Sequence, residues 1–193
     1  MIQSLCVFCG ASLGNRPDFS DVAFSVGRWM ALNNIQLVYG GGGIGLMGKL
    51  ADGALSENGK VIGVIPRFLK KKEIAHAQLN ELIVTETMHE RKIKMHQLSD
   101  AAIALPGGFG TLDELFELLT WLQLGLHNKP VGILNYNGYF NSLLQFLNDM
   151  HATEFITSQH LQLLTVKSEI TTLLDAMNLR IKPQPHNGAA QGA

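Results

Sequence analysis

Short apolar runs alternate along the whole chain with longer segments in which apolar residues recur at helical spacing. Each apolar run is closed by glycine, proline or a polar residue, as buried strands usually are. Strands that alternate with helices form a parallel sheet that helices cover on both faces. The predicted strands span residues 5–9, 36–39, 61–65, 82–85, 101–105, 131–134 and 163–166, and the predicted helices span residues 18–32, 48–57, 88–98, 111–124, 139–150 and 168–177. We therefore predict an α/β fold built on a doubly wound parallel sheet with helices on both faces.

The chain of 193 residues is long enough for one well-buried domain and short for two. It contains no internal repeat and no stretch with the composition of a linker. From residue 182 on, proline, glycine, asparagine, glutamine and alanine replace the apolar periodicity. We predict a single domain over residues 1–181 and a disordered tail over residues 182–193.

The charge balance argues against a nucleic-acid polymer or a membrane as the partner. Lysine and arginine number 15 and aspartate and glutamate 16, so the formal net charge is −1 and no basic face is expected. Hydrophobic residues make up 46% of the chain and charged residues only 16%, which favours an apolar face buried in a homo-oligomer. No apolar run reaches the roughly 20 residues of a membrane span, and no signal-like leader precedes the first strand. We expect a cytoplasmic protein.

Both cysteines, Cys6 and Cys9, lie three residues apart in the first apolar run. Side chains three apart on a strand point to opposite faces, so this pair can neither form a disulfide nor share a metal ion. We expect two buried, inert thiols, and no other feature indicates a disulfide framework.

The segment from Ala101 to Glu114 combines a buried strand, a glycine turn and the start of a helix. Pro106 ends the strand, and the glycines at 107, 108 and 110 leave the backbone free to approach a ligand. Thr111 and Glu114 have the spacing of a capping box, which predicts that the helix begins there. Free N–H groups and the positive end of a helix dipole favour a phosphate. The adjacent Asp113 and Glu114 are unusual beside an anion, and we expect this carboxylate pair to have a chemical role.

A second glycine loop, Gly40 to Gly48, contains the pattern G-x-G-x-x-G between a strand and a helix. A nicotinamide site would need an acidic residue about 20 positions further on, at the end of the next strand. That strand ends in Val-Ile-Pro-Arg at 64–67, and no Gly-Lys-Ser/Thr closes a P-loop. We expect the two glycine loops to bind a phosphate or a mononucleotide together. The alternative is that the glycines only allow tight turns, and for Gly40 to Gly42 this alternative is strong.

The helix predicted from Met88 places Met88, Arg91, Lys92 and Met95 on one stripe. A solvated basic face is the ordinary explanation for such an Arg-Lys pair. The helix leads into the strand before the Pro-Gly-Gly loop, however, and ligands of open α/β sheets bind where such strands end. We therefore predict a functional role for Arg91. His89 and Glu90 lack the second histidine of a zinc protease, so no metal site follows.

These stretches together resemble the LOG (Lonely Guy) family of cytokinin-activating phosphoribohydrolases. The resemblance rests on P-G-G-x-G-T-x-x-E at 106–114 and M-H-x-R-K at 88–92, and extends to residues 7–12, 39–48 and 121–131. It implies a Rossmann-like fold and a dimer or larger homo-oligomer. It also implies hydrolysis of the N-glycosidic bond of N6-modified adenosine 5′-monophosphates, and of AMP itself, to free base and ribose 5-phosphate.

By matching position, the resemblance makes Arg91 and Glu114 the catalytic pair, with no metal and no cofactor. Glu73 also aligns with a substrate contact of the family, although the segment 67–73 departs from the plant pattern. The substrate-binding residues that the loops and the resemblance together indicate are Ser12, Gly42, Gly43, Glu73, Lys92, Gly107, Gly108, Phe109, Gly110, Thr111, Leu112, Asp113 and Thr120.

A carboxylate close to the anomeric carbon can stabilise an oxocarbenium-like ribosyl and accept a proton from water, and we expect Glu114 to do so. Arg91 is expected to clamp phosphate or ribose oxygens and keep Glu114 ionised. Two alternatives stay open, a non-catalytic nucleotide-binding or cofactor-carrier protein and a broad nucleoside monophosphate salvage hydrolase. Lysine decarboxylation, a label that similar proteins have carried, needs pyridoxal phosphate on a lysine, and no lysine is marked out for it.

Overall fold

A computed structural model describes residues 1–70 and 75–181. Its strands are β1 (Ser4–Phe8), β2 (Gln36–Tyr39), β3 (Val61–Pro66), β4 (Glu81–Thr85), β5 (Ala101–Ala104), β6 (Val131–Leu134) and β7 (Leu164–Lys167). Its helices are α1 (Pro17–Leu32), α2 (Gly45–Ser56), α3 (Arg67–Lys70), α4 (Met88–Gln97), α5 (Phe109–Gln123), the 3₁₀ turn η1 (Tyr136–Gly138), α6 (Asn141–Ala152), α7 (Ser158–Gln162) and α8 (Ile170–Asn178).

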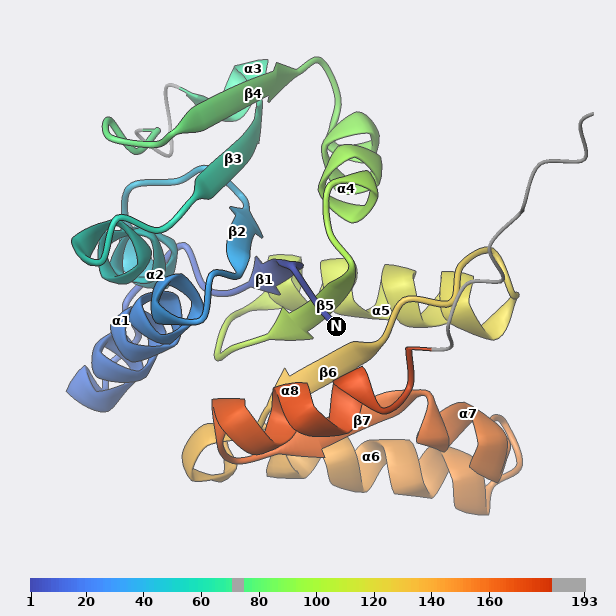
Figure 1. Cartoon of the computed structure of the whole chain (residues 1–193). Coiled ribbons are helices and arrows are strands. Elements are labelled where there is room, and N and C mark those ends of the chain that lie inside the picture. The colour runs from blue at the N-terminus through green and yellow to red at the C-terminus, as the bar shows by residue number, and fades with distance from the viewer. Residues whose placement is uncertain (71–74, 182–193) are drawn as a thin grey trace, which may run out of the picture.

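The seven strands form one parallel sheet in the order β4-β3-β2-β1-β5-β6-β7 (Figure 1). The chain runs outward from β1 to β4 on one side, then crosses back to place β5 on the other side of β1. This reversal is the switch point of a doubly wound sheet, where ligands bind beyond the carboxyl ends of the strands. The predicted α/β, Rossmann-like fold class is confirmed, and the switch point lies between β1 and β5.

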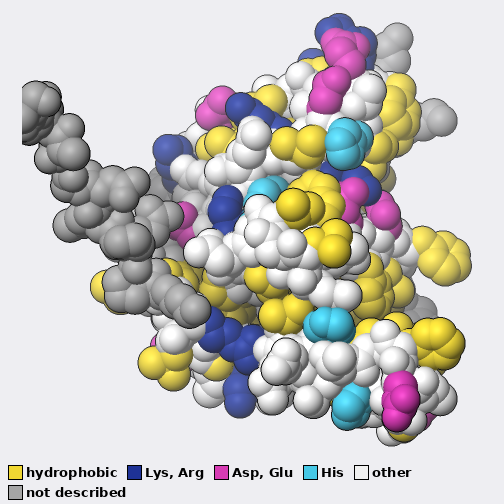
Figure 2. All heavy atoms as spheres, turned by 90° about the vertical axis from the view of Figure 1, so that its right-hand side faces the viewer, with side chains coloured by type: hydrophobic (Ala, Val, Ile, Leu, Met, Phe, Trp, Pro, Cys, Tyr) yellow, Lys and Arg dark blue, Asp and Glu magenta, His cyan; other side chains and the backbone are white. Residues whose placement is uncertain are grey.

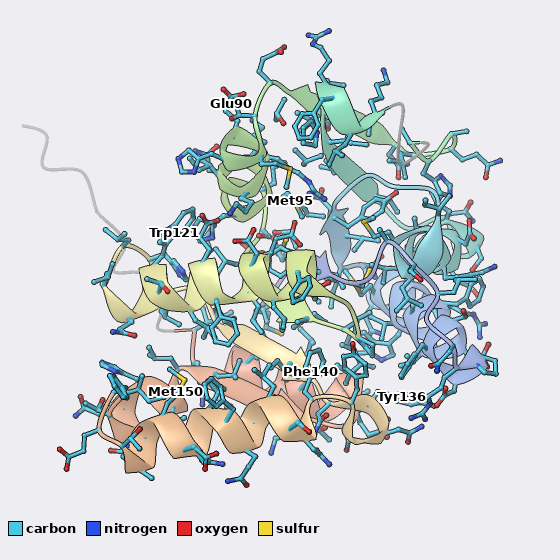
Figure 3. The ribbon with its side chains drawn as sticks, turned by 180° about the vertical axis from the view of Figure 1, so that it is seen from behind. Glu90, Met95, Trp121, Tyr136, Phe140 and Met150 are labelled. Atoms are coloured by element: carbon cyan, nitrogen blue, oxygen red, sulfur yellow. The ribbon has the colours of Figure 1, made fainter. Side chains whose placement is uncertain are left out.

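Helices cover both faces of the sheet, so the central strands are buried on both sides. Helices α1, α2 and α8 pack on one face, around Leu5, Val7 and Ile103. Helices α4, α5 and α6 pack on the other, where Figure 3 shows Met95 of α4 and Phe140 at the start of α6 pointing inward. Cys6 packs with the second cluster and Cys9 with the first, and both are free and buried, as the strand spacing predicted.

Three local predictions were wrong, and the short helices α3 and α7 were not predicted. Helix α5 begins at Phe109 with Gly108 as its N-cap, two residues before the predicted start, and no side chain caps it. The helix predicted at 139–150 is α6, which begins two residues later, at Asn141, after the 3₁₀ turn η1. The turn has Asn137 at φ 47° and Gly138 at φ 72°, left-handed values that interrupt an α-helix. The predicted start at Thr111 would put Asp113 and Glu114 in the first turn of the helix, but neither lies in the first turn of α5.

Within the described ranges, no helix is both long enough and apolar enough to cross a bilayer. The predicted tail at 182–193 and the site residue Glu73 lie outside the described residues.

Candidate active site

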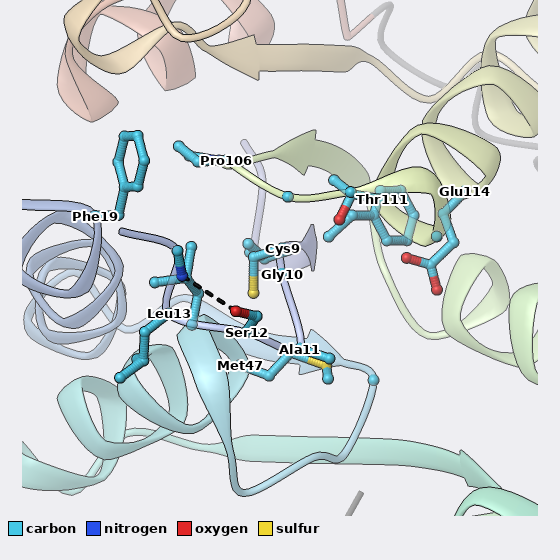
Figure 4. A pocket seen from close by; sticks show the side chains of 18 of the residues that line it. Cys9, Gly10, Ala11, Ser12, Leu13, Phe19, Met47, Pro106, Thr111 and Glu114 are labelled. Carbon is cyan, nitrogen blue, oxygen red and sulfur yellow. Dashed lines mark hydrogen bonds between the residues drawn. The ribbon is translucent and has the colours of Figure 1, made fainter. Parts of the chain in front are cut away.

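A cavity of about 610 Å³ opens at the switch point, a size typical of small-molecule sites. The end of β1, the following loop and the Pro-Gly-Gly loop line it, together with residues of α1, α2, α4 and α5. Figure 4 shows Thr111 and Glu114 of α5 on one side and Leu13 and Phe19 on the other, with Cys9 and Ser12 between them. The side chain of Ser12 is turned back toward its own loop, where its Oγ accepts a 3.2 Å hydrogen bond from the Gly14 amide.

The N-terminus of α5 faces this cavity without a side-chain cap. The three carbonyl groups of the Pro-Gly-Gly turn are each occupied by a donor, two from distant parts of the chain and one from within α5. Gly10 N donates to Pro106 O at 3.0 Å, and Leu112 N donates to Gly108 O at 3.1 Å. The hydroxyl of Tyr139 donates to Gly107 O at 2.7 Å. The amides of the first turn have no acceptors within the helix, so this end of α5 can receive an anion.

The N-terminus of α2, which follows the G-x-G-x-x-G pattern, differs. Its amides at Leu46 and Met47 both point at the carbonyl of Gly10, at 3.0 and 3.3 Å. The loop before it contributes Gly40 to the cavity wall, but Gly42 and Gly43 do not line the cavity. Gly42 O accepts a 3.2 Å hydrogen bond from the buried Tyr39 hydroxyl instead. These α2 amides are therefore occupied by protein, whereas the end of α5 is open to the cavity.

Arg91 enters the cavity wall from α4 and is only 6% exposed. Its Nε donates to the carbonyl of Val64 at 3.0 Å, and its Nη2 donates to that of Gly40 at 3.4 Å. Its Nη1 lies 3.4 Å from Oε1 of Glu114. A methyl group on Gly40 would collide with Nη2, so the glycine makes room for the guanidinium. The ends of β2 and β3 thus hold Arg91 in one orientation, directed at the carboxylate.

Glu114 is 8% exposed, lines the cavity, and lies in the second turn of α5. The predicted capping box with Thr111 does not form, because Gly108 is the N-cap and Thr111 is already inside the helix. A buried carboxylate is costly unless it is paired, and here the buried guanidinium of Arg91 is its partner. Helix capping therefore does not explain why a glutamate occupies position 114, and its side chain forms part of the cavity wall.

A second ionic cluster joins the same two helices, through Lys92 of α4 and the carboxylates of Asp113 and Glu117 of α5. Nζ of Lys92 is 3.2 Å from Oδ2 of Asp113 and 3.0 Å from Oε1 of Glu117. Asp113 lines the cavity with its carboxylate largely exposed, whereas Lys92 does not line it. Lys92 therefore supports the contact between α4 and α5.

Cys9 forms part of the cavity wall between the two sides. Burial raises the pKa of its thiol, and the negative charge of Glu114 raises it further, while Arg91 lowers it. A thiol in this environment stays protonated and is a poor nucleophile.

The cavity brings together most of the predicted site residues. Those that line it are Ser12, Arg91, Gly107, Gly108, Gly110, Thr111, Asp113 and Glu114. Those that do not are Gly42, Gly43, Lys92, Phe109, Leu112 and Thr120. Phe109 is 94% exposed, and Leu112 packs into the core cluster on its face of the sheet.

The sequence did not single out the apolar part of the lining. Leu13, Phe19, Met47 and Tyr139 come from four different elements or loops, and no local pattern links them. The helix predicted over 139–150 gives no sign that Tyr139 lies before α6 and contacts the glycine loop.

Thr120 lies instead in a second cavity, of about 330 Å³, between α5, α6, α7 and β7. Leucine, isoleucine, valine and methionine side chains form most of its wall, with Phe116 and His160. The hydroxyl of Thr120 donates to the carbonyl of Phe116 within its own helix, at 2.7 Å. Thr120 is therefore separate from the first cavity in a single chain.

Comparison with known proteins relates the chain to enzymes that act on nucleotides. Residues 47–177 match the family described as "Possible lysine decarboxylase". The chain is 48% identical to cytokinin riboside 5′-monophosphate phosphoribohydrolase LOG1 of Arabidopsis thaliana over 82% of this chain and 76% of that one. It is 48% identical to LOG4 of the same plant over 83% of this chain and 74% of that one. Among solved structures, the molybdenum cofactor carrier protein of Chlamydomonas reinhardtii superposes with a TM-score of 0.69 over 93% of this chain and 98% of that one, at 20% identity, which shows a shared fold alone.

Proposed function

The chain belongs to the LOG family of cytokinin riboside 5′-monophosphate phosphoribohydrolases, and we propose on this premise that it hydrolyses the N-glycosidic bond of adenosine 5′-monophosphates, with or without an N6 substituent. The products are a free adenine-type base and ribose 5-phosphate. The observation that carries the proposal is the buried Glu114 carboxylate, which faces the switch-point cavity beside Arg91. No lysine of the described residues lines this cavity, so a pyridoxal phosphate Schiff base has no support there.

In the proposed reaction, the bond between C1′ of the ribose and the base breaks, and its electron pair leaves with the base. Positive charge develops on the ribosyl ring, and the carboxylate of Glu114 stabilises it across the cavity. Water adds to C1′ and gives one proton to Glu114, the departing base takes up one proton from solvent, and Glu114 then returns its proton to solvent. Arg91 holds the carboxylate in place, and its guanidinium cannot act as the acid because its pKa is far too high.

The phosphate is proposed to bind at the N-terminus of α5. The amides after Gly108 are uncapped, and the carbonyl groups of the turn are occupied by other donors. This arrangement favours a dianion over a neutral group, so a nucleoside without its phosphate should be a poor substrate. The contacts expected from Lys92, Gly42 and Gly43 remain predictions, because none of the three lines the cavity.

One assay separates this function from its alternatives. The protein is incubated with AMP, N6-isopentenyl-AMP, other nucleoside monophosphates and adenosine, and free base and ribose 5-phosphate are measured. Release from the adenosine monophosphates alone supports the proposal. Release from guanine and pyrimidine nucleotides as well would favour a broad salvage hydrolase. Tight binding without any release would favour a carrier.

We also propose a homodimer or a larger homo-oligomer, built on the outer side of α5. Leu124 and Leu126, just after this helix, are 64% and 70% exposed, and Phe155 after α6 is 82% exposed. Figure 2 shows hydrophobic side chains in several clumps on this end of the molecule. The predicted nucleotide contact of Thr120 would then have to come from a second copy, since it lies outside the first cavity. Light scattering after size-exclusion chromatography tests the assembly.

A cytoplasmic location also remains a prediction.

A further inference from the structure

The hydroxyl of Tyr139 reaches the glycine loop from a part of the chain 32 residues away. It donates a 2.7 Å hydrogen bond to the carbonyl of Gly107, and the ring lines the cavity. Two edge-to-face contacts fix the ring, one with Phe19 at 5.3 Å and one with Phe140 at 4.8 Å between centroids. The hydroxyl is therefore held in place by packing that does not depend on it.

This hydrogen bond sets the direction of the peptide group between Gly107 and Gly108. A peptide between two glycines has no side chains of its own to restrict its rotation, so a contact from another part of the chain must fix it. In a planar trans peptide the C=O and the following N–H point in opposite directions. When the carbonyl of Gly107 is turned to Tyr139, the N–H of Gly108 points away from that hydroxyl. If the peptide flipped, this N–H and the carbonyl would exchange places.

The difference matters for an anion at the start of α5. A backbone N–H stabilises a phosphate oxygen, whereas a carbonyl oxygen in the same place repels it. The neighbouring carbonyls of Pro106 and Gly108 are already held, by the amides of Gly10 and Leu112. Only the carbonyl of Gly107 depends on a side chain, and that side chain is Tyr139.

We propose that Tyr139 is a positioning residue for phosphate recognition, which it serves by keeping the Gly107 carbonyl away from the bound anion. This inference rests on the proposed function in one respect, that the substrate carries a phosphate at the start of α5. It assigns to the η1–α6 junction a role in selecting monophosphates over nucleosides.

The test is Tyr139→Phe, which keeps the ring contacts and removes only the hydroxyl. Binding of AMP, inorganic phosphate and adenosine to the full chain is measured by calorimetry. Losing one hydrogen bond predicts a 3- to 10-fold weaker affinity for AMP and for inorganic phosphate, with adenosine affinity unchanged. In the base-release assay, KM for AMP should rise by the same factor while kcat changes less.

Tyr136→Phe is the matched control, because it removes a hydroxyl from the same turn that makes no hydrogen bond to the described glycine loop. Figure 3 shows Tyr136 at the edge of the molecule, near the start of α6. Unchanged affinity of Tyr139→Phe for AMP and phosphate would overturn the inference, and so would an equal loss for adenosine. If the wild-type protein binds AMP but releases no adenine, the proposed function fails, while the calorimetric comparison still decides the role of Tyr139.

Discussion

Two ionic contacts join α4 to α5 through neighbouring residues, and they differ in where they lie. Arg91 pairs with Glu114 on the cavity side, with side chains 7% and 10% exposed. Lys92 pairs with Asp113 and Glu117 nearer the surface, where the two carboxylates are 59% and 21% exposed. Both contacts pair a basic residue of α4 with acidic residues of α5. Arg91 and Lys92 are adjacent, and a rotation of about 100° per residue around the helix axis points their side chains into different surroundings.

The difference indicates which contact has a chemical role. A buried ion pair is costly to desolvate and is often no more stabilising than packed apolar residues. A surface pair contributes about 0–1 kcal/mol and costs little to keep. The inner pair is therefore poorly explained by stability, and both of its residues line the cavity. Of the outer contact only Asp113 does, and that contact is explained as one between helices. Substitutions at Glu114, Gly40, Arg91 and Lys92 can break or sharpen this distinction.

The largest effect is expected for Glu114→Gln. The variant keeps the size of the side chain and loses the base, so kcat for release of adenine from AMP should fall by about 10²–10⁴-fold. Breaking a buried pair can also destabilise the fold by up to about 3–5 kcal/mol. Activity is therefore compared at a temperature at which circular dichroism shows the variant folded.

Glu117→Gln, one turn further along α5, is the control for this variant. It removes a carboxylate from the outer contact alone, and activity should stay within a few-fold of wild type. Near-normal turnover by folded Glu114→Gln would show that the inner pair is structural after all.

The next largest effect is expected for Gly40→Ala. The added methyl group collides with Nη2 of Arg91 and must push the guanidinium away from Glu114. We expect a loss of at least about tenfold in kcat and about 1–3 kcal/mol in the free energy of unfolding, measured by urea titration.

Arg91→Lys keeps the positive charge but loses the planar guanidinium, which contacts two carbonyl groups and the carboxylate. This variant should lose most of the activity.

A double-mutant cycle decides whether the two residues act together. If Gly40 matters because it makes room for Arg91, adding Gly40→Ala to Arg91→Lys should change kcat little further. Two full, additive losses would show instead that Gly40 serves the site by another route.

A smaller effect is expected for Lys92→Met. The substitution breaks the outer contact and leaves the cavity lining intact, so stability should fall by about 0.2–1 kcal/mol and kcat/KM for AMP by less than about tenfold. A rise in KM as large as the kcat loss of Arg91→Lys would mean that Lys92 leaves its carboxylates to bind the phosphate.

The smallest effect concerns acid stability at the other end of α4. Burial lowers the pKa of His96 to about 4, with further lowering by the charges of Lys129 and His127. The unfolded chain, with an ordinary histidine pKa near 6.5, therefore binds the proton first as the pH falls. Stability should be fully present above about pH 6.5 and decline toward pH 4, followed by urea unfolding across that range.

His96→Gln should flatten this decline without affecting the ion pair at the cavity. A decline of the same steepness in that variant would assign the acid sensitivity to other groups, with His127 next to consider because burial lowers its pKa as well.

The two glycine loops show where sequence reasoning succeeded and where it could not. Both follow a strand and precede a helix, and both were predicted from residue types alone. The sequence could not show that the amides of Leu46 and Met47 donate hydrogen bonds to the carbonyl of Gly10, which lies 36 residues before Leu46. Local pattern fixes which amides are free within a helix, but an acceptor from a distant loop decides whether they remain available.

The sequence by itself determined the alternation of strands and helices, the parallel sheet and the opposite faces of Cys6 and Cys9, and it singled out Arg91 and Glu114 as candidate site residues. These features depend on periodicity and on residue types within a few positions of each other. Only the tertiary structure decided that α5 starts at Phe109 without a cap, that Gly40 admits Arg91, and that Tyr139 holds the glycine loop. Each of these depends on atoms brought together by sheet order across a long stretch of chain, and contacts of that kind leave no periodic trace in the sequence.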